Sequence, residues 1–175
     1  RDRGPGVSAM RGVAIRTRRV IALTLLTGAA AAGSAREAAA VLSACTAADI
    51  IAQNAADCPN NANPCTISKI FNIGDGCTLD FGTRSVTIKG GTSLVVGGGA
   101  MTLKSGAFTI SGDGFIDARG DGAAPNDHGG MVTILATGAV NILKIGAPGR
   151  IDVSGNLRAG AIRITAGGTF TLDGS

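Results

Sequence analysis

Pairs of apolar residues separated by a single residue recur through the sequence from Phe71 onward. Side chains two positions apart lie on the same face of a strand, so each pair predicts a short strand with one buried face. Among the first seven pairs, the starting positions 71, 79, 86, 94, 101, 108 and 116 are evenly spaced. The twelve pairs are Phe71/Ile73, Leu79/Phe81, Val86/Ile88, Leu94/Val96, Met101/Leu103, Phe108/Ile110, Ile116/Ala118, Val132/Ile134, Val140/Ile142, Ile151/Val153, Ile162/Ile164 and Phe170/Leu172.

Every third start is 22 or 23 residues further on, as from 86 to 108 or from 71 to 94. This period predicts a coil of three strands, because stacked coils bury apolar residues that one coil cannot bury alone. We therefore predict an all-β solenoid with about 22 residues per coil. An antiparallel sandwich also contains short strands and glycine turns, but its hairpins are not expected to repeat at this interval with matching positions. Of the 28 glycines, 23 lie at or after Gly74, in the turns between the predicted strands.

The second half of the sequence repeats at longer range. Residues 130–142 align position by position with residues 160–172, and each block follows a matching Ile-Asp element at Ile116 or Ile151. The connecting segments differ in length, which is how solenoids accommodate insertions between fixed strands.

The positive charge of the chain is concentrated at its N-terminus. The formal net charge is +4, but residues 1–40 hold seven of the 16 basic residues and only two of the 12 acidic ones. The remainder is nearly neutral, which argues against nucleic acid as a partner. A basic stretch after Met10, an apolar run from Val20 to Ala32 and the small residues 33–35 together predict a secretory signal peptide.

We therefore assign residues 1–35 to upstream residues plus this signal peptide, with Met10 as the natural start. The apolar run is shorter than the roughly 20 residues that span a bilayer, so we expect no transmembrane helix in the mature chain. Arg18 and Arg19 leave twin-arginine export as an alternative to the general secretory route.

Four cysteines lie close together after this leader, at Cys45, Cys58, Cys65 and Cys77. An even set in an exported protein predicts two disulfides. A metal site is the rival interpretation, but no two cysteines form a C-x-x-C pair and the only histidine is distant, so we expect no metal and no cofactor. A lipid anchor on Cys45 is a second alternative, because residues 42–45 resemble a lipoprotein box.

Residues 36–66 are predicted to form a disulfide-bonded cap with a short helix, followed by β-helix coils over residues 67–175. Thr46 and Asp49 form a capping-box pattern that opens a helix reaching Asn54. Cys58 and Cys65 flank a loop rich in turn residues, so of the three possible pairings we favour Cys58–Cys65 with Cys45–Cys77.

The two long-range repeats read G-x-I-D-x-x-G and G-x-(V/I)-x-I-x-A-x-G-x-(V/F)-x-(I/L). With the signal peptide and the cap, these motifs resemble Gly-rich right-handed parallel β-helix proteins of the bacterial surface, such as autotransporter passengers and filamentous-haemagglutinin-like adhesins. The resemblance covers roughly residues 65–175. It implies a right-handed parallel β-helix and a surface role, and it specifies architecture better than activity.

Parallel β-helices also include polysaccharide lyases and glycoside hydrolases, so the carboxylates have to be considered as possible catalytic or metal-binding groups. Asp113, Asp117, Asp121 and Asp127 are close in sequence and could bind calcium or act as acid and base. However, Asp117 occupies the same repeat position as Asp152, which favours a structural role, and the others lie in turns. His128 is interpreted as a solvated loop residue. We therefore predict no catalytic residue.

Two surface patterns remain. Arg119-Gly120-Asp121 is an RGD tripeptide at the start of the longest loop, so integrin binding is a hypothesis with the false-positive risk of any short motif. Five of the residues between paired apolar positions are threonine, but Asp, Asn, Arg and Val interrupt them, and β-propensity accounts for threonine there. The five are Thr87, Thr102, Thr109, Thr133 and Thr171.

Taken together, the sequence predicts an exported, non-enzymatic β-solenoid that is secreted or displayed on the bacterial cell surface. Its expected role is structural or adhesive, with a host-cell or extracellular polysaccharide surface as partner. The alternative is the N-terminal part of a β-helix polysaccharide lyase or glycoside hydrolase whose active site lies in coils outside this sequence. The strand pattern at 170–172 runs to the last residues without a cap, so we expect the chain to continue.

Overall fold

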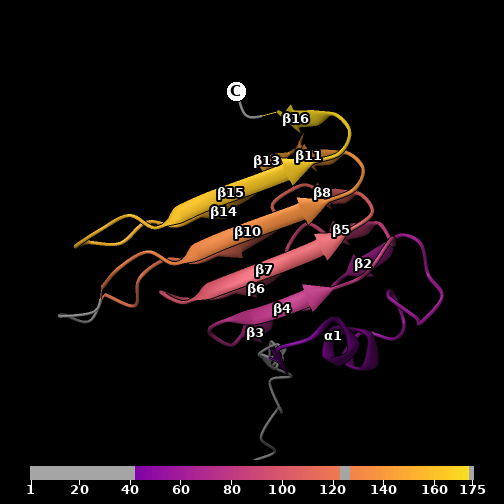
Figure 1. Ribbon diagram of the computed structural model, residues 1–175, viewed down its shortest axis with the longest axis horizontal. Helices are drawn as coiled ribbons and strands as arrows, with labels where there is room; N and C mark the ends of the chain where they lie inside the picture. The colour runs from indigo at the N-terminus through magenta and orange to yellow at the C-terminus, as the bar shows by residue number, and fades with distance from the viewer. Residues whose placement is uncertain (1–41, 123–126, 174–175) are drawn as a thin grey trace, which may run out of the picture. The chain divides into compact units, whose positions relative to one another are not determined.

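A computed structural model describes residues 42–122 and 127–173 of the chain. Residues Glu37–Ser175 form a compact unit distinct from Arg1–Arg36, and the description below concerns that unit alone. The predicted signal peptide lies outside the described residues. The described residues contain one short helix and three parallel sheets (Figure 1).

Each sheet collects strands that are far apart in sequence. The first sheet has the order β1 (Leu42–Ala44), β3 (Phe71–Ile73), β6 (Ser93–Val95), β9 (Phe115–Asp117) and β14 (Arg150–Asp152). The second has the order β15 (Ala161–Ala166), β10 (Met131–Ala136), β7 (Ala100–Ser105) and β4 (Cys77–Asp80). The third has the order β16 (Phe170–Leu172), β11 (Val140–Ile142), β8 (Phe108–Ile110), β5 (Val86–Ile88) and β2 (Cys65–Ile67).

From β3 onward, and leaving aside β12 and β13, successive strands belong in turn to the first, second and third sheets. Every coil therefore adds one parallel strand to each sheet. This topology is compatible with the predicted all-β parallel solenoid and not with an antiparallel sandwich. In the described part of the chain, the only antiparallel strand pair is the short hairpin formed by β12 (Lys144–Ile145) and β13 (Ala147–Pro148).

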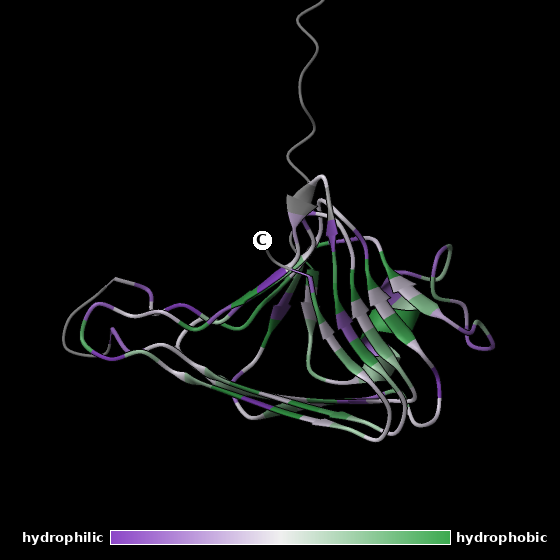
Figure 2. Cartoon of the chain, turned by 90° about the horizontal axis from the view of Figure 1, so that it is seen from above, coloured by the Kyte–Doolittle hydropathy of each residue, from purple (hydrophilic) through white to green (hydrophobic). Residues whose placement is uncertain are grey.

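The core lies between the three sheets, as Figure 2 shows in the view from above. Equivalent apolar residues stack in register from coil to coil: Phe71 on Leu94, Leu94 on Ile116, and Leu79 on Leu103. All of these side chains are fully buried. The apolar pairs expected from the sequence are therefore core positions through Val140/Ile142.

The coils are not all of equal length. Val86 pairs with Phe108, and Val140 pairs with Phe170. More residues separate Val140 from Phe170 than separate Val86 from Phe108. Loop 118–130, between β9 and β10, is described at residues 118–122 and 127–130, and these lie at one corner together with loop 153–160, between β14 and β15 (Figures 1 and 2). These two loops and the β12–β13 hairpin contain the additional residues. A parallel bridge between His128 and Arg158 joins the two loops.

The N-terminal end of the solenoid is closed by α1 (Ala47–Gln53). The predicted capping box is present: the amide of Asp49 donates to Thr46 Oγ1, and the Asp49 carboxylate accepts from the amides of Thr46 and Cys45 at 2.9 Å each. The side chain of Ile50, a residue of this helix, is fully buried. Among the described residues, no helix combines the length and apolar character that crossing a bilayer requires.

Two disulfides fasten this cap, Cys45–Cys77 and Cys58–Cys65, which is the pairing favoured from the spacing. The first ties the cap to β4, and the second closes the loop that follows the helix. Two disulfides in so short a stretch indicate folding in an oxidising environment, as in exported proteins.

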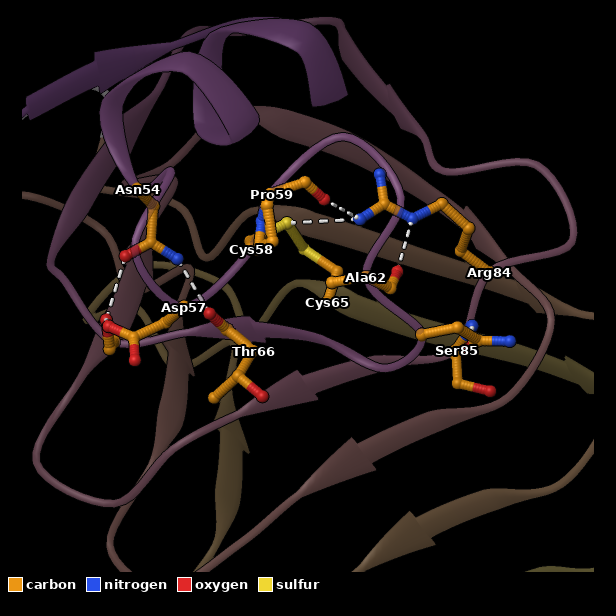
Figure 3. Close-up of a disulfide and its surroundings, with 11 residues drawn as sticks. Asn54, Asp57, Cys58, Pro59, Ala62, Cys65, Thr66, Arg84 and Ser85 are labelled. Atoms are coloured by element: carbon orange, nitrogen blue, oxygen red, sulfur yellow. Dashed lines mark hydrogen bonds between the residues drawn. A yellow bond between two sulfur atoms is a disulfide. The ribbon is translucent and has the colours of Figure 1, made fainter.

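Polar contacts complete the cap around the second disulfide (Figure 3). Asn54, which is fully buried, donates from Nδ2 to the Thr66 carbonyl at 2.6 Å and accepts from the Ser68 hydroxyl at 2.8 Å. Arg84 donates to the carbonyls of Ala62 and Pro59 at 2.8 and 2.7 Å, so it holds the loop between the cysteines against the first coil.

Candidate functional site

Loops 118–130 and 153–160, called the corner loops from here on, contain most of the residues that the sequence marked as candidates for a binding or catalytic role. Loop 118–130 begins directly after β9, and its Arg119 side chain turns back onto that strand. Arg119 donates from Nε and Nη2 to the two carboxylate oxygens of Asp117, at 2.7 and 2.6 Å. This bidentate pair is the strongest ion-pair geometry available to an arginine.

The next coil places a second carboxylate beside the same guanidinium. Asp152 stacks in register on Asp117, and its Oδ2 lies 3.9 Å from Arg119 Nε. Two stacked carboxylates would repel each other, and the shared arginine offsets that repulsion. The hydrogen bond from Arg119 holds the pKa of Asp117 below its usual value, and hydrogen bonds from Ser154 lower the pKa of Asp152.

Asp127 joins the two loops from inside. Its side chain is almost fully buried, with Oδ1 accepting from the Gly122 amide at 3.0 Å and Oδ2 accepting from the Asn156 amide at 3.2 Å. Gly120 is required here, because a methyl group at that position would overlap the Asp127 carboxylate. Asp127 thus satisfies backbone donors of successive coils, which is a structural use of a buried carboxylate.

Between these loops lies a depression of about 230 Å³, lined by Arg119, Gly120, Asp127, Ser154, Gly155 and Asn156. It is smaller than the roughly 300 Å³ at which ligand pockets begin, and its carboxylate is already committed to backbone amides. The depression is therefore poorly suited to enclose a small-molecule substrate.

The four carboxylates considered from the sequence do not converge on one point. Asp117 is paired with Arg119 and Asp127 is buried in the loops, whereas Asp113 and Asp121 are exposed. His128 is exposed, as expected for a solvated loop residue. Across the described residues, no group of three or more His, Cys, Asp or Glu side chains could hold a metal ion.

The RGD tripeptide is present at the surface, but its arginine is not extended away from the protein. The Arg119 side chain is about half exposed and remains in its ion pair with Asp117. A receptor that recognises the guanidinium has to compete with that carboxylate. The structure leaves integrin binding as a hypothesis and identifies Asp117 as the group that opposes it.

The outward-facing threonines form rows along the sheets, and these rows are not evident from the order of the residues in the sequence. On the third sheet, the central residues of the strands stack in register as Thr66, Thr87, Thr109, Asn141 and Thr171. A second row, Thr78, Thr102 and Thr133, follows the second sheet. Of the interrupting residues, Val95, Asp117 and Asp152 lie together on the first sheet. Asn141 interrupts the row on the third sheet, and Arg163 follows Thr133 on the second.

Sequence reasoning missed Thr66 and Thr78 because neither was placed between paired apolar residues, and it therefore overestimated how far the threonine rows are interrupted. The available signal was the coil period itself, since Thr66, Thr87 and Thr109 recur at nearly the same interval as the apolar pairs. The result is an uncharged row on the face of the third sheet.

Comparison of this chain with protein families, with curated proteins and with solved structures finds no match in any of the three.

Proposed function

We propose that this protein is an exported, non-enzymatic, right-handed parallel β-helix that serves as a structural or adhesive element at the bacterial surface or in the extracellular medium. Its first coils contain about 22 residues each, and longer loops are inserted in the later coils. Right-handedness follows from the general rule that parallel strand crossovers are right-handed in about 98% of cases.

The observation that carries the proposal is the use of the carboxylates at the corner loops. Asp117, Asp152 and Asp127 accept hydrogen bonds from a neighbouring arginine or from backbone amides, and each helps to join successive coils or loops. A general acid needs a pKa raised towards neutrality, yet the pKa values of Asp117 and Asp152 are lowered. These groups are suited to holding coils together rather than to proton transfer.

The compartment is supported by the disulfides and by the basic and apolar leader pattern. The two disulfides enclose the cap that closes the first coil, so correct folding requires an oxidant. Expression of the whole chain in a bacterium, followed by fractionation, tests export. We expect processed protein outside the cytoplasm with all four thiols blocked to alkylation; cytoplasmic protein with free thiols contradicts the proposal.

Adhesion is the more specific part of the proposal. The RGD tripeptide and the uncharged threonine row offer two separate contact surfaces, the second suited to hydrogen bonding with saccharide hydroxyls. Attachment of host cells and of extracellular polysaccharide to the immobilised protein distinguishes them. Asp121→Glu abolishes attachment that uses the RGD tripeptide, and unchanged attachment rules that motif out. Thr87→Val with Thr109→Val weakens attachment that uses the threonine row.

The non-enzymatic part has its own test. Incubation of the purified chain with polyuronates and other acidic polysaccharides is expected to give no new reducing ends and no unsaturated products. Measurable turnover that is lost in Asp117→Asn or Asp127→Asn contradicts the structural proposal and favours the lyase or hydrolase alternative.

A further inference from the structure

The cysteines of the two cap disulfides differ in their exposure. Cys58 and Cys65 are both 0% exposed, whereas Cys45 is an exposed residue and its partner Cys77 is 4% exposed. A disulfide opens when a thiolate reaches one of its sulfur atoms, so the rate of opening depends on access. Access therefore favours reaction at the Cys45–Cys77 disulfide, and at the Cys45 end of that bond.

A groove lies beside the Cys45–Cys77 disulfide. Its volume is about 590 Å³, which is within the range of ligand pockets, and its lining includes both cysteines together with Ser43, Asn72 and Asp75. A groove of this size admits a small thiol, or the tip of a loop that carries one, to the disulfide.

The Cys58–Cys65 disulfide is covered instead (Figure 3). Arg84 donates from Nη2 to the Pro59 carbonyl at 2.7 Å, and the same nitrogen lies 3.7 Å from Cys58 Sγ. The guanidinium also holds Ala62 of the loop between these cysteines. A reagent therefore reaches this disulfide only when the loop moves away.

The groove beside Cys45–Cys77 carries negative charge. The charged residues of its lining are Asp49 and Asp75. The Asp49 carboxylate accepts from two backbone amides at the start of α1, and Asp75 Oδ1 accepts from the Ala100 amide at 2.7 Å. Because charges a few ångströms apart are screened little by salt, an anionic reagent is disfavoured in this groove and a cationic one is favoured.

We propose that Cys45–Cys77 is a thiol–disulfide exchange site for a dithiol whose surroundings are neutral or positively charged. A thiolate of the dithiol forms a bond to Cys45 Sγ while the Cys45–Cys77 bond breaks, and the electron pair leaves on Cys77 Sγ. The second thiolate of the dithiol then attacks the reagent sulfur of the mixed disulfide, and Cys45 leaves as a thiolate. The dithiol is oxidised to a disulfide by the two electrons that reduce the protein, and its two protons pass through water to Cys45 and Cys77.

Reduction at this site loosens one part of the cap. It separates the residue that precedes α1 from β4, whereas the loop after α1 stays closed by Cys58–Cys65. The inference depends on the exposure of the cysteines and on the groove, and not on export or adhesion.

Partial reduction of the purified, fully oxidised chain by dithiothreitol, without denaturant, tests the proposal. Samples are quenched by alkylation and digested, and mass spectrometry reports the labelling of each cysteine. We expect Cys45 and Cys77 to be labelled at least about tenfold faster than Cys58 and Cys65, at a rate proportional to the dithiothreitol concentration. Equal rates for the two disulfides, earlier reduction of Cys58–Cys65, or a rate independent of dithiothreitol overturns the proposal.

Three monothiols locate the point of attack and test the charge of the groove. Cysteamine, 2-mercaptoethanol and 2-mercaptoethanesulfonate are cationic, neutral and anionic, and are compared at equal thiolate concentration. We expect rates to fall in that order over a span of at least about threefold, with the cysteamine adduct on Cys45. An adduct on Cys77 or equal rates for the three thiols contradicts the proposal.

A pair of matched variants assigns the charge effect to the groove. Asp75→Asn keeps an oxygen for the Ala100 amide but removes the charge, so it is expected to narrow the span of rates. Asp113→Asn removes an exposed carboxylate from another Asp-Gly turn, outside the lining of the groove, and is expected to leave the span unchanged. Equal effects of the two substitutions would overturn the assignment to this groove.

Discussion

The same apolar pattern gives opposite results at the two ends of the solenoid. Val86, Phe108, Val140 and Phe170 form one register row along the third sheet, yet the first three are buried and the last is half exposed. At the N-terminal end, a helix, two disulfides and a buried asparagine cover the first coil. The difference teaches that a repeat specifies a core position, whereas a neighbouring coil or cap makes it a buried one.

The largest expected effect compares two phenylalanines of that row. Phe108→Ala removes a fully buried ring between two coils, and we expect it to lower the free energy of unfolding by about 4 kcal/mol. Phe170→Ala removes a ring that is 52% exposed, so a loss of about 1 kcal/mol is expected. Urea unfolding followed by circular dichroism measures both. Equal losses in the two variants would show that the ends do not differ energetically.

The two disulfides of the cap are expected to differ in their contributions. Cys45–Cys77 joins residues 32 apart and Cys58–Cys65 joins residues 7 apart, so chain entropy predicts losses of about 3.7 and about 2.4 kcal/mol on removal. Paired Cys→Ala substitutions at each disulfide, compared by thermal unfolding, measure the difference. A larger loss from removing Cys58–Cys65 would mean that its loop, rather than the tie to β4, holds the cap.

Glycines at one corner offer a graded test of coil stacking. Gly106, Gly138 and Gly168 stack on one another from coil to coil through backbone hydrogen bonds. They differ in how much room there is for the methyl group of an alanine. At Gly106 it would overlap the Thr83 carbonyl, whereas at Gly138 the nearest atom is 3.0 Å away. We expect Gly106→Ala to cost about 2–3 kcal/mol and Gly138→Ala less than about 1 kcal/mol. Chemical denaturation of the two variants checks the order.

The smallest expected effect concerns Asp117 in the later coils. Because Arg119 lowers the pKa of this carboxyl in the folded protein, its contribution is present above the ordinary pKa of 3.8 and is lost as the pH falls through the folded value. NMR titration is expected to place the Asp117 pKa below 3.8, and Arg119→Gln is expected to raise it. Stability between about pH 5 and pH 2 then falls less steeply in Arg119→Gln. An unchanged pKa would show that the ion pair does not form in solution.

The sequence determined the local elements and much of the core, because strand alternation and helix capping depend on residues close together. The capping box at Thr46 and Asp49, the strands at Phe71, Val86, Phe108 and Phe170, and the pairing of the cysteines are all found where the pattern predicted them. The strands at Leu42–Ala44 and Cys65–Ile67 were missed, since they lie within or at the edge of the segment, residues 36–66, that the sequence assigns to the cap.

What only the tertiary structure decided is which residues from different coils come together. The sequence marked Asp117 and Asp152 as equivalent, but the shared contact with Arg119, the buried position of Asp127 and the threonine row depend on the stacking of one coil on the next. The exposure of Ile162 and Phe170 in β15 and β16 is decided in the same way, because burial depends on the neighbour that a coil has. Local pattern selects the strand, and its neighbours across the coils determine what its side chains do.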